Sequence, residues 1–209
     1  MTDKEKATEL IIKIALFMAH IDDEFHDSEF KIIKEWINQR AQTQAKDDSY
    51  KYIELSVSYG TVLTDSIELV KSRDLDIYEL CSDLRSKKNA PAEISAFDLA
   101  VEIMTADNKI HYKETSLIHQ LADLLNISDI DVMEIIDKAI LKMSKIPKKI
   151  DVEGLLKIDP TVSNKNADKR FQKEIKKWNA ATTSVDTELG RKIAQKMYDL
   201  FSEANDKYA

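Results

Sequence analysis

Residues 20–29 are HIDDEFHDSE, and residues 105–114 are TADNKIHYKE. The first stretch carries five carboxylates, and the second repeats its polar positions 85 residues later. The same shift also aligns the apolar residues that flank the two stretches. The aligned pairs include Asp22 with Asp107, Glu29 with Glu114, Ile14 with Leu99 and Ile33 with Ile118. Because one register matches apolar and polar positions together, we infer that a helix–loop–helix hairpin has been duplicated.

Apolar residues recur at helical spacing on both sides of these loops. Before the first loop, Leu10, Ile14, Phe17 and Ile21 follow one another at steps of four, three and four, which is typical of one helix face. Three Gly and three Pro are too few for a chain of strands and tight hairpins. We therefore expect an all-α protein, with the duplicated hairpin in a helical bundle over residues 1–146 and a small helical region over residues 147–209.

The composition indicates a globular protein outside the membrane. Hydrophobic residues make up 43% of the 209 residues and charged residues 33%. No apolar run approaches the roughly 20 residues of a membrane span, and the charged start MTDKEKATEL lacks the apolar core of a signal peptide. A lone cysteine, Cys81, excludes an intrachain disulfide and is expected to be a buried small side chain. We expect a cytoplasmic protein.

The net charge of -7 is unevenly distributed along the chain. Residues 146–209 carry 13 basic and 10 acidic side chains, so the first 145 residues hold all of the acidic excess. An acidic body argues against nucleic acid as a partner.

The acidic loops have two interpretations, and the sequence leaves both open. Hard divalent cations such as Ca²⁺, Mn²⁺ or Mg²⁺ bind several oxygens, often from one short loop. The candidate ligands are Asp22, Asp23, Glu24 and Glu29 in the first loop and Asp107 and Glu114 in the second. Their spacing differs from the twelve-residue EF-hand loop. Alternatively, the acids complement the positive end of a helix dipole at solvated corners of the bundle.

Four histidines raise the separate question of zinc: His20, His26, His111 and His119. Structural zinc needs four converging ligands, and no pattern in the sequence predicts such convergence. Loop caps and partly exposed side chains are the plainer interpretation of these residues.

The two loops resemble those of the tellurite-resistance TerB-like family, whose pattern is Asp-Gly-Glu-apolar-Ser/Thr-x-x-Glu. Here the glycine position holds Asp23 and Asn108, residues that tolerate positive φ, and the Ser/Thr position holds His26 and His111. The resemblance covers residues 5–145. It implies an all-helical fold and a role in stress responses that is carried out by binding.

The tail resembles a DnaJ-type J-domain over residues 152–208. Leu156, Ile158 and Pro160 match its opening pattern, and Trp178 is placed like the residue before its His-Pro-Asp tripeptide. The tripeptide itself is replaced by Asn179, Ala180 and Ala181. Since that motif stimulates the chaperone ATPase, the resemblance implies a degenerate J-domain without this activity.

A basic strip remains in the expected second helix of this tail, over residues 166–178. It consists of Lys169, Arg170, Lys173, Lys176 and Lys177, which we define as the basic strip. Such a strip can attract an acidic partner by charge, or it can be an ordinary solvated helix face.

No nucleophile elbow, P-loop or glycine-rich turn accompanies the polar residues. We therefore expect a non-enzymatic adaptor of the tellurite-resistance type that binds other proteins, such as a chaperone or a component of a stress complex. A divalent cation at the acidic loops is the one cofactor that the sequence suggests. The alternatives are a J-domain-type co-chaperone and a dedicated cation sensor.

Overall fold

The computed structural model describes residues 2–23, 25–159 and 166–208. Within these residues the expectation of an all-α protein is confirmed, because the only strands are two of two residues each. The first hairpin consists of α1 (Asp3–Ala19) and α2 (Asp27–Ala45), and the second of α5 (Ala90–Met104) and α6 (Tyr112–Leu125). Helices α3 (Ser49–Lys71) and α4 (Ile77–Ser86) connect the two hairpins, and α7 (Asp129–Leu141) follows the second.

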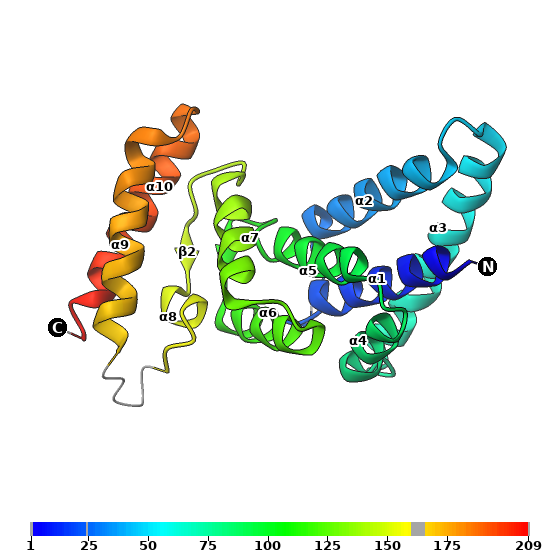
Figure 1. Ribbon diagram of the computed structural model, residues 1–209, viewed down its shortest axis with the longest axis horizontal. Coiled ribbons are helices and arrows are strands. Elements are labelled where there is room, and N and C mark those ends of the chain that lie inside the picture. The colour runs from blue at the N-terminus through cyan, green and yellow to red at the C-terminus, as the bar shows by residue number, and fades with distance from the viewer. Residues whose placement is uncertain (1, 24, 160–165, 209) are drawn as a thin grey trace.

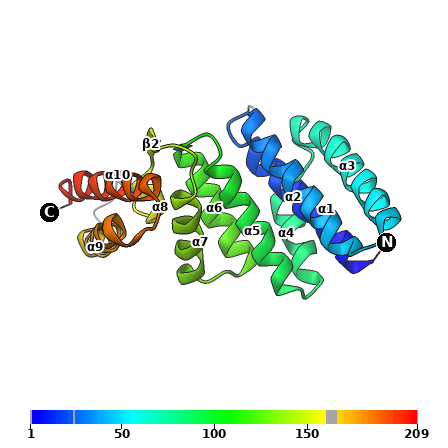
Figure 2. The same cartoon turned by 90° about the horizontal axis from the view of Figure 1, so that it is seen from above.

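The first helices of the two hairpins, α1 and α5, pack against each other at the centre of the bundle (Figure 2). Both are apolar nearly all round, as is expected of helices that are covered on every side. Ile12, Ile14 and Leu16 of α1 and Phe97 and Val101 of α5 are all fully buried. The duplicated pair of helices therefore forms the core of the domain.

Helix α3 runs without a break through Gly60. Its inner face is fixed to the first hairpin by a chain of hydrogen bonds. The Tyr59 hydroxyl donates to Oε1 of Gln44 at 2.6 Å, and Nε2 of Gln44 donates to the Thr8 hydroxyl at 2.9 Å. Helices α1, α2 and α3 are thus joined through buried polar groups.

The tail forms one end of an elongated molecule, and the two chain termini lie at opposite ends (Figure 1). Strand β2 (Lys149–Ile150) leads into the short helix α8 (Val152–Leu155), and α9 (Ala167–Ser184) and α10 (Glu188–Asn205) form a helical hairpin. Ile193 and Met197 of α10 are fully buried.

The expected linker after Pro147 is in fact packed against the bundle. Strand β2 pairs in parallel with β1 (Lys109–Ile110) of the second loop, and Ile150 is buried. Lys148 and Lys149 predict a solvated linker, but the apolar Ile150 that follows them lies against the core and anchors the segment. The tail therefore packs beside the bundle.

Helix α9 is longer than the expected second helix of a J-domain. It continues six residues beyond Trp178, so Asn179, Ala180 and Ala181 are helical and do not form a loop. None of the three is Gly or Pro, and the alanines favour helix strongly. Pro160, part of the J-domain pattern, lies outside the described residues.

Candidate functional site

The two acidic loops have the same backbone geometry. Asp23 and Asn108 occupy equivalent positions with φ of 69° and 63°, as expected for residues in the glycine position of the family pattern. The backbone N–H of Asp23 donates to the His20 carbonyl at 3.0 Å, and that of Asn108 donates to the Thr105 carbonyl at 3.3 Å. The duplication that the sequence predicts is therefore visible in the loop conformation.

Each loop ends in a glutamate that caps the following helix. Oε2 of Glu29 accepts a hydrogen bond from the His26 backbone N–H at 3.0 Å, and Oε2 of Glu114 accepts one from the His111 backbone N–H at 2.7 Å. This is the glutamate half of a capping box, in which the third helical residue satisfies the N–H of the capping residue. The glutamate keeps this capping role even though histidine replaces the usual Ser or Thr at the capping residue.

The fold brings carboxylates of the two loops together. The pKa of Glu29 is raised to about 7, chiefly by burial, with smaller contributions from the charges of Asp22 and Asp107, while the bond from His26 opposes the rise. Burial likewise raises the pKa of Glu114 to about 8, with Asp107, Glu29 and Asp22 adding to the effect. The charge of at least one acid of the other hairpin therefore adds to the raised pKa of each glutamate.

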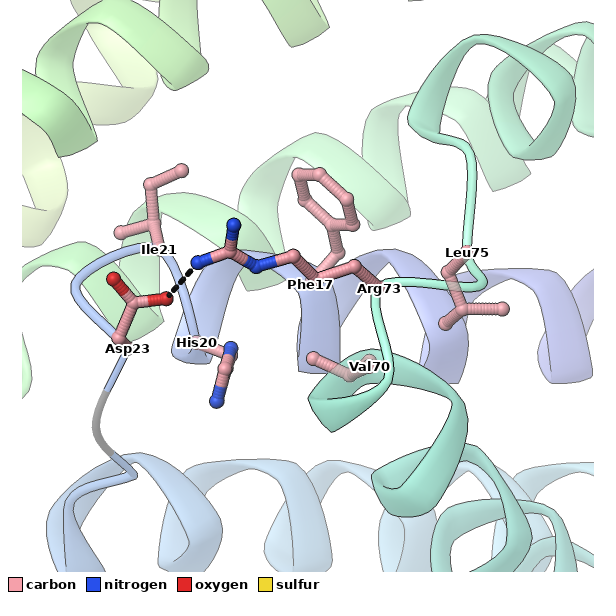
Figure 3. A pocket seen from close by; sticks show the side chains of 7 residues that line it. All are labelled: Phe17, His20, Ile21, Asp23, Val70, Arg73 and Leu75. Atoms are coloured by element: carbon pink, nitrogen blue, oxygen red, sulfur yellow. Dashed lines mark hydrogen bonds and ion pairs between the residues drawn. The ribbon is translucent and has the colours of Figure 1, made fainter.

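Asp23 is not part of this group, although the sequence suggests it as a ligand. Its side chain turns toward the segment after α3, where Oδ1 lies 3.1 Å from a guanidinium nitrogen of Arg73 (Figure 3). This ion pair lies at the edge of a pocket of about 370 Å³ with Phe17, Val70 and Leu75 among its lining residues. Glu24, the next candidate ligand, lies outside the described residues.

The second loop is more constrained than the first. Oδ1 of Asp107 accepts a hydrogen bond from the Lys109 backbone N–H at 2.8 Å, and Oδ2 lies 3.8 Å from the Lys109 ammonium group. Asn108 accepts two more bonds from the tail, one from Lys145 and one from Lys148. In the first loop, Asp22 lies 3.6 Å from Nε2 of His26 and is 45% exposed. Asp107 is therefore held by a lysine of its own loop, whereas Asp22 lies beside a histidine.

No ready-made metal centre is present in the described part of the chain, where no three His, Cys, Asp or Glu side chains converge around one point. His119, a zinc candidate by sequence, has another role. Its Nε2 lies 2.9 Å from the Gly154 carbonyl oxygen and 3.1 Å from that of Leu155, so it donates to the end of α8. The donor set therefore suits a weakly held oxygen-binding cation better than zinc.

The basic strip of α9 divides into three parts. Lys177 bonds within the chain, to Asp137 of α7 at 2.7 Å and to the buried Glu174. Arg170 and Lys173 face a groove between α7, α8 and α9. Lys169 and Lys176 point to solvent. The sequence predicts the charge of this helix but not the groove, because α7 and α9 are brought together only by the packing of the tail.

None of the helices in the described ranges is both long and apolar enough to cross a bilayer. Comparison with curated proteins and with solved structures finds no match. The family model of tellurite resistance protein TerB matches residues 8–136, which include both hairpins and both loops and make up more than half of the chain. This match agrees with the duplicated loops and with the helical fold, and the chain belongs to the TerB family.

Proposed function

We propose that this TerB-family protein is a non-enzymatic adaptor of the tellurite-resistance type, in which a divalent cation bound between the two acidic loops adjusts how the domain meets a partner protein. The single observation that carries the proposal is that the two duplicated loops interact electrostatically: Asp107 raises the pKa of Glu29, and Glu29 and Asp22 raise that of Glu114. Asp107 is held by Lys109, so the first loop and Glu114 would supply most of the oxygens.

The cation would act by removing repulsion. Without it, burial and like charges oppose ionisation of Glu29 and Glu114. A bound cation would neutralise these carboxylates and draw the ends of α1 and α5 together. Since the described residues of the two loops form no metal centre, we expect weak binding and a coupling to partner affinity of about 1 kcal/mol, a typical allosteric magnitude.

Calorimetric titration with Ca²⁺, Mn²⁺ and Mg²⁺ tests this proposal. We expect saturable binding to the natural chain and loss of that binding in the Asp22→Asn/Glu29→Gln variant, which keeps side-chain size and the capping acceptor. The matched control is Asp65→Asn/Asp83→Asn, which removes two exposed carboxylates far from the loops in sequence. Absence of binding at about 1 mM metal, or equal loss in the control, would refute the cation site.

The alternative of a J-domain co-chaperone has a separate test. The family match ends within α7, so the J-domain interpretation of the tail stays a prediction. Because Asn179, Ala180 and Ala181 lie within α9, we expect no rise in the ATPase rate of a DnaK-type chaperone when the protein is added. A clear rise would favour the co-chaperone over the adaptor.

A further inference from the structure

A groove of about 380 Å³ lies where the tail meets the TerB domain, a volume typical of binding sites for small ligands or a few side chains. One wall is apolar: Ile130 and Met133 of α7 stand three residues apart on the same helix, and Ile130 is 79% exposed. The floor is formed by Leu155 and Leu156 at the end of α8. An isoleucine so exposed beside a hollow offers apolar surface that an incoming side chain can cover.

The opposite wall is cationic. Arg170 and Lys173 of α9 line the groove, also three residues apart, and neither side chain has a hydrogen-bonding or ion-pair partner among the described residues. The acidic side chains along the groove are already paired with lysines of the same chain: Asp129 with Lys157, Glu134 with Lys138, and Asp137 and Glu174 with Lys177. Lys177 serves two of these acids, so the four acidic and four basic side chains that line the groove balance in number. Arg170 and Lys173 are the lining cations that have no partner among the described residues, and they make the α9 wall locally positive.

We propose that this groove binds an acidic amphipathic segment of a partner protein, with its apolar side chains against Ile130 and Met133 and its carboxylates against Arg170 and Lys173. A helix with apolar residues at steps of three and four and acids beside them matches both walls at once. Nucleic acid would use the cationic wall only and would be repelled by the acidic body. The groove would serve the adaptor role proposed above.

The probe is a fluorescently labelled peptide of about 18 residues, or five helical turns, with leucines at steps of three and four and glutamates between them. We expect saturable binding to the full chain by fluorescence anisotropy, and weaker binding at high salt. A scrambled peptide of the same composition should bind at least about tenfold more weakly, because it cannot place leucines and glutamates on separate faces.

Two pairs of substitutions locate the binding site on α9. Arg170→Glu/Lys173→Glu reverses the groove charges, and Lys169→Glu/Lys176→Glu makes the same change of charge on the same helix outside the groove. We expect the first pair to weaken peptide binding by about tenfold or more and the second by less than about threefold. Thermal melting followed by circular dichroism checks that each variant is folded. If Arg170→Glu/Lys173→Glu is unfolded, the milder Arg170→Gln/Lys173→Gln variant is used in its place.

The apolar wall has its own matched pair of variants. Ile130→Asp should abolish peptide binding, whereas Ile94→Asp, at a 49% exposed isoleucine of α5, should leave it unchanged. The proposal would be overturned if the groove and control variants had equal effects, or if the scrambled peptide bound equally well. Tighter binding of single-stranded DNA, or occupation of the groove by a second copy of the chain, would also overturn it. No metal is used, so failure here leaves the cation proposal standing, and failure of the cation proposal leaves this one standing.

Discussion

Glu29 raises the pKa of Glu114 across the two hairpins, although the residues lie 85 positions apart in the chain. Both cap the second helix of their hairpin, and both are withdrawn from water where α1 and α5 end. The glutamates that cap the second helix of each hairpin, Glu29 and Glu114, therefore interact with each other electrostatically. Burial is the main cause of both raised pKa values, and the charges of the opposite hairpin add to it, so the stability of the domain depends on pH.

The first prediction concerns stability at alkaline pH. Because the pKa values of Glu29 and Glu114 rise from 4.5 to about 7 and about 8, the folded chain holds these protons more tightly than the unfolded chain. Their stabilising contribution is complete below pH 4.5 and is lost as the pH rises through 7 and 8. We expect Glu29→Gln/Glu114→Gln to exceed the natural chain in free energy of unfolding at about pH 8.5 by on the order of 2 kcal/mol, since Gln stays neutral.

Urea denaturation from about pH 5 to 8.5, with a chelator present, measures this effect. Glu5 is the control, because it caps α1 in the same manner but its pKa is lowered and not raised. Its bond from the Thr2 N–H and its ion pair with Lys51 lower its pKa. Glu5→Gln should therefore reduce stability at neutral pH. An unchanged pH profile in the Glu29→Gln/Glu114→Gln variant would show that the two glutamates are not buried together.

The second prediction concerns stability at acidic pH. Burial lowers the pKa of His119 below 6.5, so the unfolded chain binds this proton more tightly. The contribution of neutral His119 is present above pH 6.5 and is lost as the pH falls through the lowered value. His119→Ala should cost about 1–2 kcal/mol at pH 7 by removing the donor to the α8 carbonyls, and much less at pH 5. His111→Ala, an exposed position next to the same helix, should show no such difference when both are followed by urea denaturation.

The sequence is a good guide to the bundle and a poor guide to its junction with the tail. The spacing of Leu10, Ile14 and Phe17 predicts α1 because helical periodicity is a local property. The loop duplication predicts equivalent positions for Asp22 and Asp107, but their contacts differ, because Asp22 lies beside His26 and Asp107 is held by Lys109. By contrast, nothing near Asp23 in the sequence indicates Arg73, whose position depends on how α3 ends.

The same distinction holds for the basic strip. Its five charges are visible in the sequence, but Lys177 forms an ion pair with Asp137 of α7 and is half-buried, whereas Lys176 is exposed, and only tertiary packing separates them. Likewise, the lysines of residues 148–149 indicate a solvated linker, yet Ile150 next to them joins the core. The charge and the hydrophobic periodicity of a segment can be predicted from the sequence, but its long-range contacts cannot.

The third prediction concerns the ion pairs of Lys177. Its ammonium group lies 2.7 Å from Oδ2 of Asp137 and also contacts Glu174, which is 4% exposed. Lys177→Met leaves both carboxylates without a cation. We expect a loss of about 2 kcal/mol, less than the 3–5 kcal/mol typical of a fully buried pair because Lys177 is 36% exposed.

Thermal melting of Lys177→Met, of Lys176→Met and of the triple variant Lys177→Met/Asp137→Asn/Glu174→Gln separates charge from packing. The neighbouring Lys176→Met should be nearly neutral, and the triple variant should recover most of the loss by removing the unpaired charges. If Lys176→Met costs as much as Lys177→Met, the contact between α7 and α9 does not depend on this ion pair.

The fourth prediction compares two glycines. A Cβ atom at Gly154 would collide with the side chains of Asp151 and Thr115, whose hydrogen bond of 2.8 Å joins α8 to α6. Gly154→Ala should therefore cost about 1–3 kcal/mol, as overpacking does. A Cβ atom at Gly60 in α3 would have no neighbouring heavy atom within 4 Å, so Gly60→Ala should stabilise the helix by about 0.5–1 kcal/mol.

The same pair of variants also measures how far the tail depends on α8. If α8 fixes the tail to the bundle, Gly154→Ala should increase amide hydrogen exchange in β2 and α9 more than in α1 and α5, because the interface loosens first. Gly60→Ala should leave exchange in the tail unchanged. Uniform acceleration of exchange in all helices of the Gly154→Ala variant would mean that bundle and tail unfold as one unit, and that the interface carries no separate stability.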